Sequence, residues 1–299
     1  MDKVRIITNP NAGQNKLQPA METIVGKLGK VFSDVEVYET KEAGDAGRYL
    51  EKTAGDVDLI VVAGGDGTVH EAINALCPLE KQPVLAILPG GTSNDFSRAV
   101  GMDQDPLIAV DQLLKQDIRS IDVGKTNDQY FSNFWGIGLM THVSENIDPD
   151  AKEMFGRMSY YMSVAQNIGT YEPFQLKVTS DEGDFDGEAA MLIVGNGSFT
   201  GGIRAFFPKS NIRDGLLDVL IVKETSLKTL WSILQSKLVK DFPENDEGMI
   251  YFQTDQLSVS AEPKQLVDCD GERNFYTPSE ISVLPAHIQM IVGDIDKVN

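Results

Sequence analysis

The spacing of apolar and polar positions changes once along the chain. In roughly the first 120 residues, short apolar runs alternate with segments that place apolar residues at helical spacing. We expect strands at 4–7, 35–38, 58–63 and 83–88 and helices at 17–31, 43–54, 68–76, 93–100 and 107–115. The run 58–63 is apolar on both faces, which is typical of a parallel strand covered by helices on each side. This part is therefore predicted to be a doubly wound α/β sheet.

After about residue 120, short alternating stretches separated by turn residues dominate, which predicts antiparallel β structure. We expect strands at 120–125, 130–138, 175–180, 189–194, 217–222, 249–254 and 256–260, and helices around 151–169 and 226–241. The predicted fold is thus α/β plus β, with an α/β domain at 1–122 and an antiparallel β-sandwich at 123–285. The apolar stretch near the end returns the chain to the first domain at about 286–299.

Composition narrows the classes of partner. The formal net charge of −19, from 26 basic and 45 acidic residues, repels nucleic acid and anionic lipid at long range. We therefore expect no nucleic-acid partner, and any contact with phosphate must come from local groups. Two distant cysteines and no secretion signal favour the cytoplasm. No apolar run reaches the ~18 residues that a membrane-spanning helix needs.

The run Gly64–Thr68, with the sequence Gly-Gly-Asp-Gly-Thr, follows the most apolar strand and precedes an expected helix. Ligands of open α/β sheets bind outside the carboxyl ends of the strands. Glycines there let backbone amides approach an anion, and the helix N-terminus adds partial positive charge. Asp66 is suited to hold a magnesium ion rather than to touch a phosphate. A plain strand-to-helix turn is the alternative, which three glycines around one Asp make less favoured.

Two further polar loops follow strands. Pro89–Phe96 comes after the fourth strand, and its Thr92 or Ser93 can cap the next helix. Asn9–Gly13 comes after the first strand. Because the carboxyl ends of parallel strands share one edge of the sheet, the three loops are expected to line one crevice. Neither GxGxxG nor GxxxxGK[ST] occurs, so neither a Rossmann dehydrogenase nor a P-loop enzyme is supported.

Two acidic segments stand out in the second half. Within 211–218, Asp214 and Asp218 flank a turn, a pattern that suits a hard cation but also an ordinary Asp-Gly turn. Within 268–272, three acids occupy five residues. A clustered carboxylate can have a raised pKa and act as a base, whereas a solvated hairpin turn would look the same. From the local pattern alone, the turn is favoured in both cases.

Taken in order, these motifs resemble the bacterial diacylglycerol kinase catalytic family, lipid kinases related to eukaryotic diacylglycerol and sphingosine kinases. The resemblance covers nearly the whole chain and uses Asn9–Gly13, Gly64–Thr68, Pro89–Phe96, Gly201–Asp218 and Asp270–Glu272. The Gly-Gly-Asp-Gly motif alone is shared with NAD kinases and phosphofructokinases, so the ordered set carries the specificity. It implies ATP and Mg²⁺ as cofactors and a lipid-binding β-sandwich domain.

The resemblance also implies roles for single residues. Glu272 would be the general base, and Asp66 would order the catalytic magnesium. The residues implied in nucleotide binding are Asn9, Asn11, Gly13, Thr40, Gly64, Gly65, Asp66, Gly67, Thr68, Val69, His70, Thr92, Asn94 and Asp95. Those implied in binding a structural magnesium are Asn211, Asp214 and Leu216. The chain departs from the family pattern at 207–210, where Phe-Pro-Lys-Ser replaces Ala-Pro-x-Ala, and at His70, where Asn is frequent.

The expected function is ATP-dependent transfer of the γ-phosphoryl group to a lipid hydroxyl, most directly diacylglycerol to phosphatidic acid in phospholipid biosynthesis. The alternatives are another lipid (a sphingoid base, an isoprenoid alcohol or a phosphatidylglycerol-like lipid), a soluble substrate such as NAD, and a silent nucleotide-binding regulator. A lipid kinase would be cytoplasmic and transiently associated with the membrane surface. The segments 226–242 and 204–209 are candidate membrane contacts. For 226–242, a helix that packs on its own domain is the favoured alternative. An exposed β edge in the second domain would also permit a homodimer.

Overall fold

The structure is a computed structural model that describes residues 1–10, 17–139, 141, 172–202, 204, 206–207, 209–223 and 248–298. The chain divides into two compact units. The first comprises Met1–Val123 and Pro285–Asn299, and the second comprises Gly124–Leu284. The helices expected around 151–169 and 226–241 lie outside the described residues.

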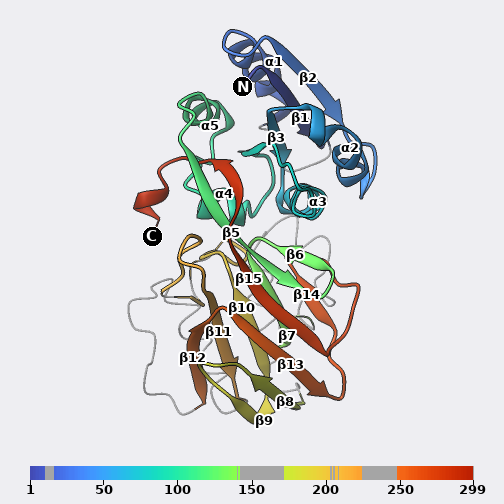
Figure 1. Cartoon of the computed structure of the whole chain (residues 1–299), viewed down its shortest axis with the longest axis vertical. Helices are drawn as coiled ribbons and strands as arrows, with labels where there is room; N and C mark the ends of the chain where they lie inside the picture. The colour runs from blue at the N-terminus through green and yellow to red at the C-terminus, as the bar shows by residue number, and fades with distance from the viewer. Residues whose placement is uncertain are drawn as a thin grey trace. The chain divides into compact units, whose positions relative to one another are not determined.

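A parallel sheet forms the centre of the first unit (Figure 1). Its strands are β1 (Lys3–Thr8), β2 (Asp34–Glu39), β3 (Leu59–Gly64) and β4 (Val84–Pro89), in the order β2-β1-β3-β4. Every residue of β3 is buried, as expected for a strand with helices on both faces. Beyond β4, the sheet continues into β15 (Ser279–Ile291), where Met290 pairs in parallel with Leu85.

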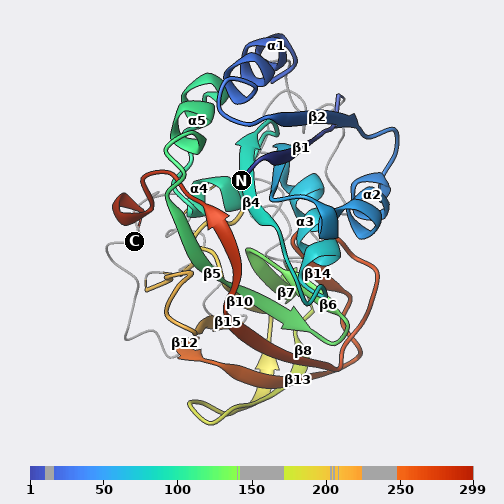
Figure 2. The same cartoon turned by 45° about the horizontal axis from the view of Figure 1, so that its top comes forward.

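The helices of the first unit include two packed pairs. They are α1 (Leu17–Leu28), α2 (Asp45–Thr53), α3 (Asp66–Leu76), α4 (Asp95–Ala99) and α5 (Pro106–Leu113), with short 3₁₀ turns at Ala54–Asp56 and Ile295–Lys297. α1 packs against α5, and α2 packs against α3. Figure 2 shows the two pairs on opposite sides of the strands, as right-handed crossovers in this strand order require. The predicted doubly wound α/β fold is confirmed.

The second unit contains two sheets (Figure 1). Its strands are β6 (Gln129–Phe131), β7 (Phe134–Gly138), β8 (Phe174–Thr179), β9 (Phe185–Ala189), β10 (Met191–Gly195), β11 (Leu217–Val222), β12 (Met249–Thr254), β13 (Gln256–Glu262) and β14 (Val267–Cys269). One sheet has the order β12-β11-β10-β7-β14 and is antiparallel throughout. The other contains β9, β8, β13 and β15, and β6 pairs with β5 (Ile118–Thr126).

Apolar side chains from both sheets form the core of the second unit. This core includes Phe131, Trp135, Ile137, Phe174, Leu176, Leu192, Val194, Val219, Ile221, Leu257, Val259 and Ile281. All twelve are almost completely shielded from solvent, as close packing between two inner sheet faces requires. The predicted β-sandwich is confirmed.

The structure differs from the sequence pattern in four places. The stretch 130–138 forms two strands, β6 and β7, because Ser132 and Asn133 turn their backbone N–H groups to the carboxylate of Asp270. β9 and β14 were not predicted, and α3 begins at Asp66 rather than at residue 68. No helix in the described part of the chain is both long and apolar enough to cross a membrane.

Candidate functional site

The two glycine loops of the first unit meet at the carboxyl ends of β3 and β4. Gly64 pairs with Pro89 in the parallel register, and the Gly90 N–H donates to the Gly64 carbonyl at 2.8 Å. A β-carbon on Gly65 would lie 3.1 Å from the Cα atom of Gly91. The loops therefore contact each other backbone to backbone, and this contact leaves no room for side chains.

Asp66 links the two loops. Its Oδ2 accepts the N–H of Asn94 at 2.8 Å, and its Oδ1 accepts the N–H of Asp95 at 2.6 Å. Asn94 has a φ of 51°, and its side-chain amide binds both the N–H and the carbonyl of Gly91. The Asp66 carboxylate thus satisfies N–H groups at the start of α4, as a capping side chain does. That Asp66 also orders a magnesium ion remains a prediction.

Gly67 is the most accessible residue of the first loop. It is exposed at the start of α3, and a β-carbon built on it would meet no atom within 4 Å. The side chains of the next three residues, Thr68, Val69 and His70, are at most 8% exposed. On the second loop, Thr92 is exposed. Ligand access to the first loop is therefore through backbone N–H groups near a helix N-terminus, an arrangement that suits an anion.

The third loop begins where β1 ends. Thr40, just after β2, donates its N–H to the Thr8 carbonyl at 2.9 Å, and both threonines are buried. Asn9 follows and is partly buried. Asn11 and Gly13 lie outside the described residues. The predicted nucleotide-binding residues of the first unit that are described thus all lie at or next to the carboxyl ends of β1 to β4.

The predicted magnesium ligands lie on the turn before β11. The Asp214 N–H faces the Asn211 carbonyl at 3.4 Å, and Asp214 Oδ1 accepts the Leu216 N–H at 3.0 Å. Asp214 is exposed, so its carboxylate can reach an ion that keeps part of its water shell. No three His, Cys, Asp or Glu side chains gather to hold a metal among the described residues. The donor set is one carboxylate with carbonyl oxygens, which fits Mg²⁺ better than a soft metal.

Asp218 behaves differently from Asp214, although both belong to this segment. It is 1% exposed and accepts a very short hydrogen bond from the Tyr251 hydroxyl of the neighbouring strand β12. Burial raises the pKa of Asp218 to about 7, and Asp214 adds repulsion. Burial and the Asp218 charge also raise the pKa of Tyr251, which keeps the phenol protonated as the donor. The local sequence gave no signal for this pair, because Tyr251 comes from a distant strand.

The turn at Asp270–Glu272 joins β14 to the segment that follows. Cys269 and Glu272 exchange two backbone hydrogen bonds of 2.9 Å, with φ angles of 53° at Asp270 and 98° at Gly271. Positive φ at both central residues is the geometry that Asp-Gly favours in tight hairpins. Glu272 is exposed. A base carried on such a turn can meet a substrate from solvent.

Asp270 anchors the turn rather than facing solvent. Its carboxylate accepts four hydrogen bonds of 2.6–3.0 Å, from the Ser132 N–H and hydroxyl and from the N–H groups of Asn133 and Phe134. It is 9% exposed. The solvated-turn interpretation of the three acids therefore holds only for Glu272.

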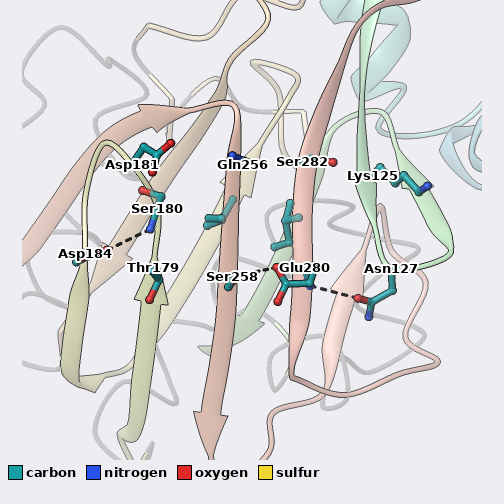
Figure 3. Close-up of a pocket in the computed structure, with 12 residues that line it drawn as sticks. Lys125, Asn127, Thr179, Ser180, Asp181, Asp184, Gln256, Ser258, Glu280 and Ser282 are labelled. Carbon is teal, nitrogen blue, oxygen red and sulfur yellow. Dashed lines mark hydrogen bonds between the residues drawn. The ribbon is translucent and has the colours of Figure 1, made fainter.

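A separate hollow of about 760 Å³ lies among β5, β8, β13 and β15 (Figure 3). Its polar lining comes from the turns and strands around β5, β8, β13 and β15 and includes Lys125, Ser180, Asp184, Ser258 and Glu280. These side chains mostly bind their neighbours: Ser258 donates to Glu280 at 2.6 Å, and the Ser180 N–H donates to Asp184 at 3.1 Å. The hollow contains none of the motif residues, and we assign no ligand to it.

Two buried or partly buried acids in the first unit were missed by sequence reasoning. Asp122, 2% exposed, accepts the N–H of Ala286 at 2.7 Å and so fixes the returning end of the chain. Glu71 accepts three N–H groups at the start of α2, from Gly44, Ala46 and Gly47. Neither lies in a motif, and both are recognisable only once distant segments are brought together.

Comparison with known proteins agrees with this architecture. Residues 3–126 match the model of the diacylglycerol kinase catalytic domain, and residues 136–292 match the YegS C-terminal NAD kinase beta sandwich-like domain. A protein of Bacillus subtilis (strain 168) named diacylglycerol kinase is 30% identical over 294 residues, 98% of this chain and 97% of the relative.

Solved structures are similar along the same length. The crystal structure of a diacylglycerol kinase from Bacillus anthracis str. Sterne is 39% identical, with a TM-score of 0.86 over 98% of this chain and 97% of that one. Another crystal structure from the same strain is 41% identical, with a TM-score of 0.88 over the same shares.

A doubly wound sheet with paired glycine loops, followed by a β-sandwich that carries an Asp-Gly-Glu turn, defines the chain as a kinase of the α/β-plus-β type. Its relatives narrow that class. The chain belongs to the diacylglycerol kinase family of lipid kinases.

Proposed function

We propose that the protein is an ATP-dependent lipid kinase that transfers the γ-phosphoryl group of ATP to a lipid hydroxyl, with diacylglycerol as substrate and phosphatidic acid as product. The observation that carries the proposal is the paired glycine loops of the first unit. They leave Gly67 open beside the N-terminus of α3, where backbone N–H groups can bind phosphate oxygens. The choice of diacylglycerol is supported by the names of the relatives.

In this proposal, the loops at Gly64–His70 and at Thr92–Asp95 bind the triphosphate, and Thr40 and Asn9 border it. The exposed Glu272 carboxylate takes the proton from the lipid hydroxyl. The hydroxyl oxygen then bonds to the γ-phosphorus while the bond to the β–γ bridging oxygen breaks, so ADP leaves and Glu272 keeps the proton. Positioning and charge neutralisation would supply most of the rate, because the phosphoryl group passes through a loose transition state.

The Asn211–Leu216 turn would hold a magnesium ion through the Asp214 carboxylate and the carbonyls of Asn211 and Leu216. When bound, Mg²⁺ neutralises negative charge and rigidifies the turn that leads into β11. Asp66 holds the second glycine loop in place and is proposed to order the magnesium that accompanies ATP.

Transfer of radiolabel from γ-labelled ATP tests the proposal. The purified full chain is assayed with Mg²⁺ against vesicles that contain diacylglycerol, a sphingoid base, an isoprenoid alcohol or phosphatidylglycerol, and against NAD in solution. We expect label in phosphatidic acid. Glu272→Gln should lower turnover by about 10²–10⁴-fold, whereas the exposed Glu182→Gln on a distant turn serves as a matched control and should behave as wild type.

Each other outcome of this assay selects an alternative. Label in NAD alone would favour a soluble-substrate kinase, which the description of the matched NAD kinase-like β-sandwich also suggests. Label in another lipid would change the substrate and keep the chemistry. ATP binding without transfer to any acceptor would favour a silent regulator. Full turnover in Glu272→Gln would remove Glu272 as the base.

A lipid substrate requires contact with a membrane surface, and we propose a cytoplasmic protein that associates with it transiently. The aromatic rings of one candidate contact, Phe206 and Phe207, are at most 2% exposed, so they do not present an apolar surface to lipid. The other candidate, 226–242, lies outside the described residues. Co-sedimentation with vesicles, with and without substitutions of Trp231, tests that segment, and sedimentation velocity tests the proposed homodimer.

A further inference from the structure

Asp268 directly precedes the turn Cys269–Glu272 in sequence and is hydrogen-bonded to it. It sits in β14, and its Oδ1 accepts the N–H of Gly271, a central residue of the turn, at 2.8 Å. The side chain is 6% exposed. A buried carboxylate that bonds to a turn N–H restricts the conformations of that turn, and here it restricts the residue next to Glu272.

Among the residues that the structure describes, Asp268 has one cationic neighbour, Arg273. Its Oδ2 lies 3.9 Å from Arg273 Nε, and an Arg273 guanidinium N–H donates to the Thr141 carbonyl at 3.3 Å. Arg273 directly follows Glu272 in sequence, so the two side chains that flank the turn are both fixed. The arrangement holds the turn from both ends.

Burial raises the pKa of Asp268 to about 6. The Gly271 N–H and Arg273 oppose this rise, and the charges of Asp270 and Glu272 add to it. The carboxylate is therefore ionised in most molecules above pH 7 and protonated in most molecules below pH 5.

We propose that Asp268 is a positioning residue for Glu272: it fixes the turn that presents the base and places a second negative charge behind it. The inference rests on the proposed function, in which Glu272 is the general base. A fixed turn keeps the Glu272 carboxylate oriented toward the substrate hydroxyl, and the second negative charge stabilises the proton as it moves onto Glu272, so the transfer is faster at neutral pH. Arg273 limits the repulsion, so that Asp268 keeps its charge at neutral pH.

In the described part of the chain, few other charges face this carboxylate. On its own turn they are Asp270 and Glu272, followed by Arg273. The facing loop Ser132–Phe134 has no charged side chain and contributes hydrogen-bond donors to Asp270. Thr141 contributes only its carbonyl. Between pH 5 and 7, a change in activity that depends on residue 268 therefore reports on this cluster.

The test is the pH profile of kcat and KM in the full chain, for wild type, Asp268→Asn, Asp268→Ala and Arg273→Gln. Asn keeps an oxygen that can accept the Gly271 N–H but carries no charge. At pH 7.5, we expect Asp268→Asn to lower kcat about three- to tenfold with an unchanged KM for ATP. Below pH 5.5, its rate should converge on that of wild type, because the wild-type Asp268 is then mostly protonated and residue 268 is uncharged in both proteins. Asp268→Ala should lower kcat further at every pH, because alanine cannot accept the Gly271 N–H.

Arg273→Gln should move the rise of kcat with pH to higher pH, whereas Asp268→Asn should remove that rise. Without the guanidinium, Asp268 keeps its proton to a higher pH, so the activity should recover only at a higher pH than in wild type. The double variant Asp268→Asn/Arg273→Gln should have the same kcat as Asp268→Asn alone, because both substitutions act through the charge of Asp268. A merely structural role predicts additive losses at all pH values.

The outcomes separate this inference from the function on which it rests. If wild type turns over and Glu272→Gln does not, but Asp268→Asn has a wild-type profile, the inference is overturned and the proposed function stands. An Asp268→Asn loss of equal size at every pH would also overturn it. Absence of turnover in wild type with every acceptor would remove both. Thermal unfolding at pH 5 verifies folding, since Asn closely matches the protonated Asp there.

Discussion

A β-carbon on Gly91 would lie 2.6 Å from the Cα atom of Gly65, closer than such atoms come in folded proteins. The contact is between two backbones, so neither side can yield by rotating a side chain. Both glycines are thus required by the fold itself, whatever the loops bind. Gly67, two residues beyond Gly65, has no such neighbour, and this difference allows packing and ligand binding to be tested separately.

We expect Gly91→Ala to destabilise the first unit by about 1–3 kcal/mol, because the added methyl group overpacks a backbone contact. Gly67→Ala should fold at least as well as wild type, since alanine is favoured over glycine in a helix. It should nevertheless weaken ATP binding about tenfold or more, because the methyl group occupies the approach to the backbone N–H groups. Thermal unfolding and calorimetric titration with ATP measure the two effects. Wild-type ATP affinity in Gly67→Ala would show that phosphate does not approach there.

Asp66→Asn should destabilise the second loop. The carboxylate accepts N–H groups on both oxygens, whereas an amide can accept only on one and turns its NH₂ group toward the other donor. We expect a loss of about 1–3 kcal/mol in the free energy of unfolding and weaker ATP binding.

The magnesium dependence of Asp66→Asn separates its two suggested roles. If Asp66 acts by holding the loop, ATP affinity stays low at every Mg²⁺ concentration. Recovery of activity in excess Mg²⁺, measured by initial rates, would instead identify Asp66 as a metal ligand. The capping Asp105, which accepts the Leu107 N–H at the start of α5, provides a control cap far from the glycine loops.

Mg²⁺ should raise the thermal stability of the wild-type protein without ATP, and Asp214→Asn should abolish the effect. An ion that binds only the folded state contributes about 2.7 kcal/mol at a hundredfold excess over its dissociation constant. Asp214 is exposed and Asn keeps an oxygen for the Leu216 N–H, so the substitution should change stability in EDTA much less than Mg²⁺ does in the wild type. Melting curves in EDTA and in Mg²⁺ measure both. Equal Mg²⁺ stabilisation in Asp214→Asn would mean that the ion binds elsewhere.

The contribution of Asp218 to wild-type stability should fall between about pH 4 and pH 7. Burial raises the pKa of this carboxyl group in the folded state to about 7, so the folded state binds the proton more tightly than the unfolded state does. The resulting stabilisation is fully present below the unfolded pKa and is lost as the pH rises through 7.

Asp218→Asn should remove this dependence, because Asn can still accept the Tyr251 hydroxyl but does not ionise. Relative to wild type, the variant should become more stable as the pH rises from 4 to 8. Denaturant unfolding in EDTA at several pH values measures the difference, with the exposed Asp181→Asn as control. A constant difference at all pH values would contradict the assignment.

The glycine loops could be predicted because their position follows from local rules. A strand that is apolar on both faces is central, its carboxyl end lies at the ligand edge, and glycines mark the turn. The same rules place Asn94 and Asp95 beside Asp66 only approximately, because the bonds that join them depend on the left-handed backbone at Asn94.

The acidic turns could not be predicted in the same way. Asp270 occurs in a sequence typical of a solvated hairpin, yet it is buried because a loop some 135 residues earlier offers it four donors. That loop also divides the expected strand 130–138. β9 alternates acidic residues with Phe185, Gly187 and Ala189, which is too weak a pattern to identify an edge strand without its partner. The burial of Asp270, the division of 130–138 and the strand β9 all depend on partners that are distant in sequence. A local sequence pattern does not contain information on such partners.

The two strands β5 and β15 connect the two units of the chain. Each begins in one unit and ends in the other, and the first unit is completed only when Ala286 returns to Asp122. The second unit is therefore an insertion within the first rather than a module added to its end. An exchange of substrate specificity between relatives would require replacement of one internal segment at two junctions. A truncation after β5, by contrast, would remove the returning strand beside β4.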